Sequence, residues 1–121
     1  MEKLTKQEEE VMRSIWHQGT CCVKEILQEM DDPKPPYTTL ASVVKNLERK
    51  AYVKPQQKGN TYYYTPRVKE SDYKRNFMSC FVSDYFANSY KEMVTFFARE
   101  QKISAEELKE ILRSIEEGNK E

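Results

Sequence analysis

The stretch that decides the fold is YTTLASVVKNLERKAYVKPQQKGNTYYYTPRVK, residues 37–69. It holds seven Lys and Arg residues and one acid, a net charge of +6, in a chain whose total formal charge is zero. The flanking segments 1–36 and 70–121 each carry a net charge of −3, from five bases and eight acids in the first and eight bases and eleven acids in the second. A neutral chain that concentrates its positive charge in one segment is expected to bind a polyanion there.

The first half of this stretch has the periodicity of a helix, which we place at about 38–50. Its apolar residues fall on one helical face; they are Leu40, Val43, Val44 and Leu47. The second half is rich in Thr, Val and Tyr, which is typical of strands, at 52–58 and 61–65. Gly59-Asn60 between the strands suits the tight turn of a hairpin, because glycine adopts the positive φ that such turns need.

Two further helices are predicted upstream of residue 37. Thr5-Lys6-Gln7-Glu8 is a capping box that opens the first helix, and Gly19 ends it. A short extended piece at 20–23 leads into a second helix near 23–30. The prolines between 33 and 36 then require a loop. Three helices followed by a hairpin indicate a winged helix-turn-helix, in a protein that is mainly α with a small β-wing.

The exposed face of the helix at 38–50 is the candidate for reading DNA. Small side chains at its start would let the backbone approach the floor of the major groove, and basic side chains further along could reach phosphates or guanine edges. The alternative is the solvated face of an ordinary amphipathic helix. The tyrosines of the hairpin are expected to pack against the core on at least one side. The predicted DNA-binding residues are Tyr37, Thr38, Thr39, Ala41, Ser42, Lys45, Asn46, Arg49, Lys54, Lys58 and Asn60.

The C-terminal third carries more aromatic surface than its two or three predicted helices can bury alone. Full burial of a large apolar side chain contributes roughly 1.5–3 kcal/mol, so a second copy of the chain is the simplest cover for this surface. The alternative is a monomer in which these helices fold back. We therefore expect a DNA-binding domain at 1–68 and a helical dimerisation domain at 69–121. The predicted dimer interface is Tyr73, Phe77, Phe81, Tyr85, Phe86, Met93, Phe97, Leu108, Ile111, Leu112 and Ile115.

Residues that could carry catalysis or hold a metal or cofactor are not arranged for it. His17 is the only histidine and stands beside Trp16, and Asp31-Asp32 lies in the proline-rich loop without a partner set. Cys21, Cys22 and Cys80 lack metal-ligand spacing, and a reducing cytoplasm is the expected location. We expect no enzyme, no cofactor and no membrane insertion, since there is no run of 18 apolar residues. Two other functions stay open: a protein-interaction module, and a thiol-responsive regulator that uses Cys21 and Cys22.

Three motifs resemble a known family of repressors. They are Tyr37-Thr38-Thr39-Leu40, the run from Leu47 to Val53, and Tyr62-Tyr63-Tyr64. Together with the first predicted helix, from Leu4-Thr5 to Ile15-Trp16, they are similar to the penicillinase and methicillin-resistance repressors (BlaI/MecI). The resemblance covers nearly the whole chain. One departure is Ala51, where the family usually has glycine after the helix.

The resemblance implies a homodimeric repressor of palindromic promoter DNA, in a family best known from antibiotic resistance. It also implies release from DNA when a membrane-bound sensor zinc protease is activated and the repressor is cut in its dimerisation domain. The matching stretch here is Thr95-Phe96-Phe97-Ala98-Arg99, which would place the cleaved bond between Phe96 and Phe97. Phe96 stands where well-known members have asparagine. The copper-sensing branch has a C-terminal cysteine cluster, which this chain lacks.

Overall fold

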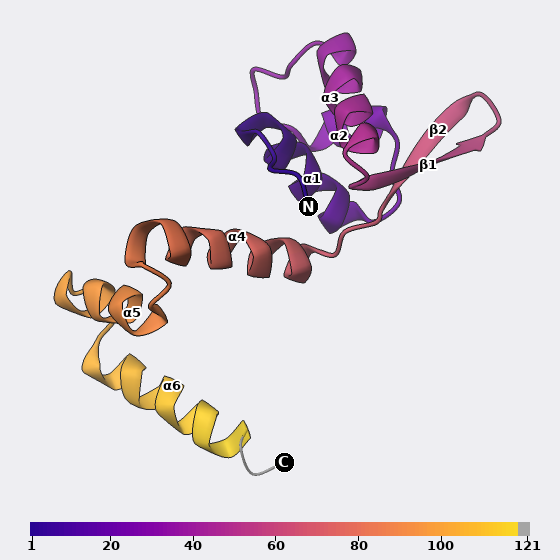
Figure 1. Cartoon of the computed structure of the whole chain (residues 1–121). Coiled ribbons are helices and arrows are strands. Elements are labelled where there is room, and N and C mark those ends of the chain that lie inside the picture. The colour runs from indigo at the N-terminus through magenta and orange to yellow at the C-terminus, as the bar shows by residue number, and fades with distance from the viewer. Residues whose placement is uncertain (119–121) are drawn as a thin grey trace. The chain divides into compact units, whose positions relative to one another are not determined.

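The computed structural model describes residues 1–118 and divides the chain into two compact units, Met1–Lys74 and Arg75–Glu121. The first unit contains α1 (Lys6–Gln18), α2 (Val23–Glu29), α3 (Tyr37–Arg49) and the hairpin of β1 (Val53–Lys58) and β2 (Thr61–Pro66) (Figure 1). Helix α4 (Glu70–Phe86) begins in the first unit and ends in the second. Helices α5 (Tyr90–Arg99) and α6 (Ala105–Gly118) complete the described chain.

The order of elements confirms the winged helix-turn-helix. The two strands of the wing pair antiparallel, from Val53 opposite Pro66 to Lys58 opposite Thr61. Gly59 has a φ of +62° at the turn between them, which is the role expected of a glycine there. The extended piece before α2 joins this sheet: Cys21 N–H donates to the Tyr64 carbonyl at 3.1 Å, and Tyr64 N–H donates to the Cys21 carbonyl at 2.7 Å.

The core of the first unit lies between the three helices and the root of the wing. The apolar faces expected from periodicity are buried there, including Val11 and Ile15 of α1 and Val44 and Leu47 of α3. Tyr64 is buried in the same cluster, whereas Tyr62, on the same side of the strand but nearer the turn, is exposed, and Tyr63 on the other side is half-buried. The expectation that one side of the tyrosine run packs inward is therefore confirmed.

Local caps form as the sequence predicts. In α1, the Thr5 hydroxyl accepts from Glu8 N–H at 3.1 Å, and the Glu8 carboxylate accepts from Thr5 N–H at 2.8 Å. Ser104 and Glu107 make the same reciprocal pair at the start of α6. A further contact of this kind was not predicted from the sequence: the Glu25 carboxylate accepts from Cys22 N–H at 3.0 Å.

The last residue of α3 leads into a left-handed turn at Ala51, whose φ is +66°. Ala51 N–H donates to the Glu48 carbonyl at 3.0 Å, and Tyr52 N–H donates to the Leu47 carbonyl at 2.9 Å. This pair of hydrogen bonds is the Schellman motif, which normally has glycine at the left-handed position. The turn into the wing thus keeps the usual backbone although alanine replaces glycine.

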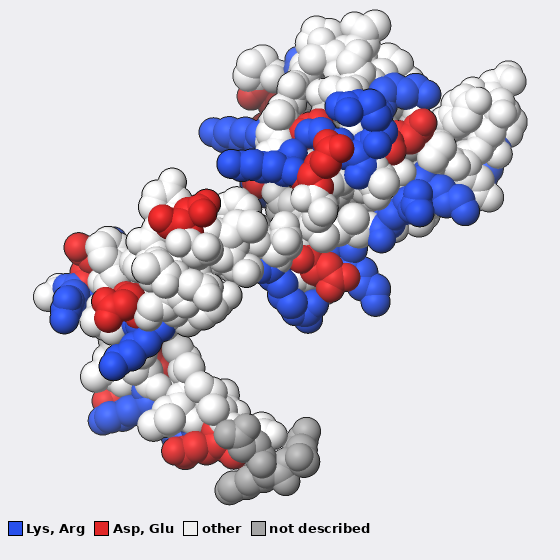
Figure 2. Space-filling model, in the orientation of Figure 1, with Lys and Arg blue, Asp and Glu red and all other residues white. Residues whose placement is uncertain are grey.

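The second unit has very little core of its own. Among its described residues only Val82 has a fully buried large hydrophobic side chain. The aromatic rings contact one another in a chain, with centroids 5.0 Å apart for Phe81 and Tyr85 and 5.7 Å apart for Phe86 and Phe96. No residue of α5 or α6 is buried. Figure 2 shows that the visible face of α4 carries few charged side chains.

Candidate nucleic-acid interface

The first turn of α3 is open to solvent on its reading face. Tyr37, Thr38 and Thr39 are exposed, and Pro36 before them has no side chain that can cap the helix. The N–H groups of this turn therefore remain able to bind an anion. Ser42, one turn on, donates its hydroxyl proton to the Thr38 carbonyl at 3.1 Å. Its oxygen lone pairs stay available, so Ser42 can accept a hydrogen bond at this surface while its proton is already donated.

The side chains proposed to contact DNA are accessible in this unit. Ala41 is half-buried, and the other ten are exposed. Lys45 and Arg49 follow the small residues along α3, and Lys54, Lys58 and Asn60 lie on the wing. Figure 2 shows basic side chains gathered over the winged unit, near α3 and along the hairpin, with acidic side chains among them. Their role as DNA contacts stays a prediction.

The two faces of β2 hold different lysines. The Lys45 ammonium lies 5.7 Å from the centre of the Tyr62 ring, and the Lys58 ammonium lies 5.5 Å from the centre of the Tyr63 ring. Lys45 also lies 3.9 Å from a Glu48 carboxylate oxygen, one helical turn away. A cation over an aromatic face is held by the ring quadrupole at about 0.5–1 kcal/mol when exposed. The wing thus restrains a lysine of α3.

Lys50 does not belong to the accessible positive charge, although it counts in the net +6 of the segment. Its ammonium lies 2.7 Å from the Glu8 carboxylate and donates to the Lys3 carbonyl at 3.0 Å. The two side chains are only 12% and 5% exposed. Burial raises the pKa of Glu8, but hydrogen bonds from Lys50 and Thr5 outweigh it and leave the pKa below its ordinary value. Lys50 therefore joins the end of α3 to the start of α1 and is unavailable to a polyanion.

A groove of about 630 Å³ lies where α2, α3 and β2 meet. Four of the predicted contact residues line it: Tyr37, Ala41, Lys45 and Asn60. The groove also includes Lys24 at the start of α2 and the exposed ring of Tyr62, neither of which the sequence analysis proposed. Lys24 stands in a segment of net negative charge, so only the folded arrangement identifies it.

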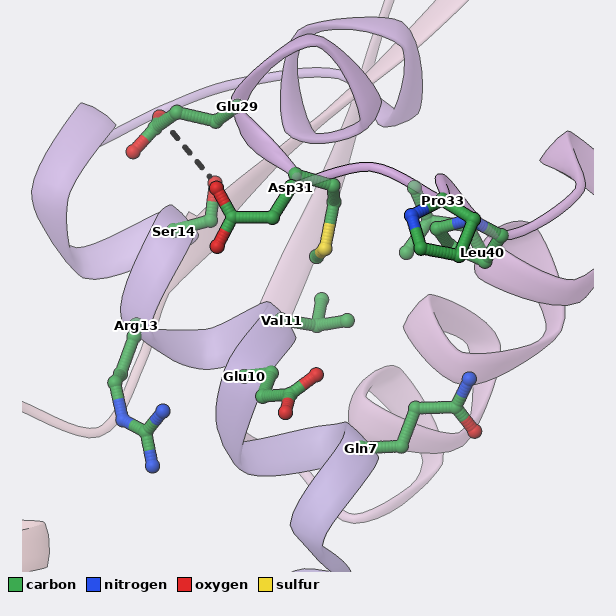
Figure 3. A pocket seen from close by; sticks show the side chains of 11 residues that line it. Gln7, Glu10, Val11, Arg13, Ser14, Glu29, Asp31, Pro33 and Leu40 are labelled. Carbon is green, nitrogen blue, oxygen red and sulfur yellow. Dashed lines mark hydrogen bonds between the residues drawn. The ribbon is translucent and has the colours of Figure 1, made fainter.

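A second groove of the winged unit has the opposite character (Figure 3). It occupies about 540 Å³ between α1 and the loop that connects α2 to α3. Glu10, Glu29 and Asp31 line it, and the Ser14 hydroxyl donates to Glu29 at 3.4 Å. Three carboxylates against the single cation of Arg13 make this surface unsuitable for a phosphate backbone.

Of the residues considered for other chemistry, Cys22 lines the first groove and Asp31 lines the second. Cys21 is fully buried, and burial followed by the negative charge of Glu25 raises the pKa of its thiol to about 12. A thiol with such a pKa is almost never a thiolate at neutral pH, which counts against a redox role for Cys21. His17 is paired with Glu29 at 2.9 Å. No cluster of three potential metal ligands occurs in residues 1–118, and no helix within that range is long and apolar enough to cross a bilayer.

The residues predicted for the dimer interface fall into three groups. Tyr73 lies in the first unit, where its hydroxyl donates to Glu9 at 2.5 Å and its ring contacts Trp16 and Tyr52. Five others are half-buried within the second unit: Phe81, Phe86, Met93, Phe97 and Leu108. The remaining five are exposed: Phe77, Tyr85, Ile111, Leu112 and Ile115.

Comparison with known proteins gives consistent results. The sequence profile of the penicillinase repressor family matches residues 4–117. A penicillinase repressor of Bacillus licheniformis is 27% identical over 120 residues, which cover 95% of this chain and 91% of that protein. A penicillinase repressor of Staphylococcus aureus is 26% identical over 117 residues, which cover 93% of each.

The fold of the winged unit is also found among solved structures. The solution structure of the DNA-binding domain of the repressor BlaI superposes with a TM-score of 0.52 at 27% identity, covering 60% of this chain and 94% of that one. The family resemblance drawn from the three motifs is thereby confirmed. With its profile match over nearly all of the described chain, this protein belongs to the penicillinase repressor family of non-enzymatic, DNA-binding transcription regulators.

Proposed function

We propose that this protein is a homodimeric repressor that binds palindromic promoter DNA through residues 1–68 and dimerises through residues 69–121. The exposed face of α3 carries the argument. It places small side chains in its first turns and Lys45 and Arg49 beyond them, next to a basic wing. Small residues permit close approach to base edges, and the cations neutralise phosphates. Such a repressor acts in the cytoplasm, where promoter DNA lies.

The dimer part of this proposal is supported by the exposed apolar surface of α5 and α6. Ile111, Leu112 and Ile115 are each about half exposed on one face of α6. An apolar face of this size on a described helix with no buried residue would be costly to leave in water. A twofold interface covers it with the same face of a second copy. Two copies then present two reading helices to the two halves of a palindrome.

Binding to DNA can be tested with the full chain and the DNA upstream of its own gene. Lys45→Ala and Arg49→Ala should each weaken binding and flatten the slope of log affinity against log salt by roughly 0.9 if the cation meets a phosphate. Lys74→Ala is the matched control, because that exposed lysine lies outside both the wing and α3. If neither α3 variant changes affinity, α3 is not the reading helix.

We further propose that repression is relieved by cleavage between Phe96 and Phe97, carried out by a membrane-bound sensor zinc protease. The exposure of Phe96, at 48%, supports this bond, which lies within α5. A protease needs an extended substrate, so α5 must open locally before it is cut.

Mass spectrometry of the repressor from induced cells tests this bond. Two fragments that meet at Phe96–Phe97 are expected. Phe96→Asp should slow the cut at this bond without placing a helix breaker in α5, and Tyr85→Phe, outside α5, should leave it unchanged. Induction with an intact repressor would contradict proteolytic relief while leaving the DNA-binding proposal standing.

A further inference from the structure

The walls of the groove between α2, α3 and β2 come from three different elements, and they carry lysine and tyrosine side chains. Lys24 comes from α2, Lys45 from α3, and Tyr62 from β2. The two lysine side chains are exposed, and the rings of Tyr37 and Tyr62 are 55% and 48% exposed. Lysine ammonium groups are among those that proteins use to hold phosphate oxygens.

The groove is continuous with the proposed reading surface. Ala41 and Lys45 of α3 form part of its wall, and Asn60 brings in the turn of the wing. Lys24 lines the same groove, so it lies within the surface that a polyanion along α3 and the wing turn would cover. None of the acidic side chains of the second groove lines this one. The first groove is thus positively charged and suited to a phosphate chain, whereas the second is negatively charged and would repel one.

We propose that this groove holds the sugar–phosphate backbone of one DNA strand, with Lys24 as a phosphate contact and Tyr62 as a positioning residue for Lys45. The proposal rests on the DNA-binding function proposed above and assigns two residues to it. Lys24 supplies the charge of the α2 wall. Tyr62 holds the Lys45 ammonium over its ring, 5.7 Å from the centroid, and so keeps this cation on the groove side of α3.

Glu48 makes this positioning necessary. Its carboxylate lies 3.9 Å from the Lys45 ammonium, and its Oε1 is buried without a hydrogen-bond partner among the described residues. Without the Tyr62 ring, this carboxylate would be the neighbouring partner left to the ammonium, with the weak attraction of an ion pair at an exposed site. The aromatic face offers a competing attraction on the wing side. Lys45 is thereby shared between two partners, and a phosphate in the groove can recruit it.

The test for Lys24 uses operator fragments in which single phosphates are replaced by neutral methylphosphonates. For the intact protein, one such replacement should weaken binding several-fold, and Lys24→Ala should weaken binding to natural DNA by a similar factor. With both changes together the loss should not grow further, because they remove the same contact. The salt slope of Lys24→Ala should fall by about 0.9. Lys6→Ala, in the first turn of α1 and outside the groove, is the matched control.

The test for Tyr62 compares two replacements at that position. Tyr62→Phe keeps the aromatic face beneath Lys45 and should keep affinity within about twofold. Tyr62→Leu removes the face and should lower affinity about two- to fivefold, the equivalent of the 0.5–1 kcal/mol of an exposed cation–π contact. In a Lys45→Ala background, Tyr62→Leu should have no further effect, which a merely structural role would not produce.

The outcomes separate this inference from the proposed function. If the intact protein binds its operator with a salt slope but Lys24→Ala behaves like Lys6→Ala, the groove assignment is wrong and DNA binding stands. If Tyr62→Phe is as damaging as Tyr62→Leu, the positioning role is wrong. If the intact protein shows no salt-dependent operator binding, the proposed function itself fails.

Discussion

The two units of this molecule differ in how much of their apolar surface they bury. The winged unit buries a continuous cluster from α1, α2, α3 and the wing, and it pairs its one buried cation, Lys50, with Glu8. The second unit buries a single large hydrophobic side chain, Val82, among its described residues and leaves one face of α6 open. The first unit has the core of an independent domain. The second has the composition of half an interface.

The difference shows that one amphipathic pattern can serve two purposes. The apolar stripe of α3 and that of α6 have similar spacing, but Val44 and Leu47 are buried, whereas Ile111 and Ile115 are about half exposed. Local sequence does not distinguish them. The distinction depends on whether other elements of the same chain can reach the stripe.

The largest effect is expected when the open face of α6 is made charged. Ile111→Asp should prevent association, because an aspartate would be buried without a partner in a twofold interface. Loss of the second DNA half-site should then weaken operator binding by about 10²–10⁴-fold, since linked binding events reinforce each other by that factor. Analytical ultracentrifugation and gel shift measure the two effects.

Glu110→Lys is the control for this prediction, because residue 110 lies on the opposite side of α6 from the apolar face and also changes charge. It should leave both the mass and the affinity unchanged. If the unsubstituted protein is a monomer in solution, the apolar face of the second unit is not a dimer interface.

The next largest effect is expected inside the winged unit, at Lys50. Lys50→Met leaves the Glu8 carboxylate buried without its cation, a change that typically costs about 3–5 kcal/mol of unfolding free energy. Lys54→Met, on the exposed side of β1, should change stability by no more than about 0.5 kcal/mol. Chemical denaturation of both variants measures the difference in unfolding free energy. Equal stability of the two variants would show that Lys50 behaves like an exposed lysine.

This ion pair also predicts a pH dependence. The folded pKa of Glu8 lies below its unfolded value of 4.5, so its contribution is present above that value and is lost as the pH falls through the folded pKa. In Lys50→Met, the hydrogen bonds from Thr5 remain but the two effects of Lys50 that lower the pKa of Glu8 are lost, so its pKa rises relative to the intact protein and its ionisation adds less stability at neutral pH. The stability gap between the two proteins should therefore be widest near pH 7 and should narrow below about pH 4.5, as denaturation at several pH values would show.

Sequence alone was sufficient for the elements of the winged unit and insufficient for the partners of its charges. Capping at Thr5, the turn at Gly59 and the stripe of α3 depend on neighbouring residues, and all three were predicted. Lys50 and Glu8 stand 42 positions apart. Nothing in the local pattern separates Lys50 from the lysines that stay exposed, because only the packing of α3 on α1 creates its environment.

The same limit explains the residues missed at the candidate interface. Lys24 stands among acids in the sequence, and it joins Lys45 only because α2 packs against α3 and the wing. Tyr73 was assigned to the dimer interface because it continues the four-residue spacing of Phe77 and Phe81. The structure places its ring against Trp16 and Tyr52, so the periodicity of α4 runs across two different environments.

A smaller effect is expected at Tyr73, which is held by the winged unit. Tyr73→Phe keeps the ring contacts and removes the hydrogen bond from the hydroxyl to the Glu9 carboxylate, at 2.5 Å. A hydrogen bond to a charged group contributes about 1.5–3 kcal/mol, so unfolding free energy should fall by that amount. Tyr85→Phe removes a hydroxyl from a side chain that is 74% exposed and should change little. If the two variants lose equal stability in urea, the start of α4 is not part of the first core.

The smallest effect is a gain in stability, and it tests the turn between α3 and the wing. Ala51 has a φ of +66°, a conformation that is unfavourable for residues with a Cβ and open to glycine. Ala51→Gly should raise the unfolding free energy of the winged unit by roughly 0.5–1 kcal/mol, because the relief of about 1–2 kcal/mol in the folded state is partly offset by the greater freedom of glycine in the unfolded chain. Thermal unfolding at one protein concentration measures it, and Ala51→Val should shift stability the other way.

The matched position in the second unit is Gln101, which follows α5 with a φ of +61° and closes it with the same pair of backbone hydrogen bonds. Gln101→Gly should give a similar local gain. If the second unit folds only with its partner, the gain of Gln101→Gly must appear in an unfolding transition whose midpoint temperature rises with protein concentration. The gain of Ala51→Gly should appear in a separate transition whose midpoint does not depend on protein concentration. Two gains in a single concentration-independent transition would show that both units fold as one monomer.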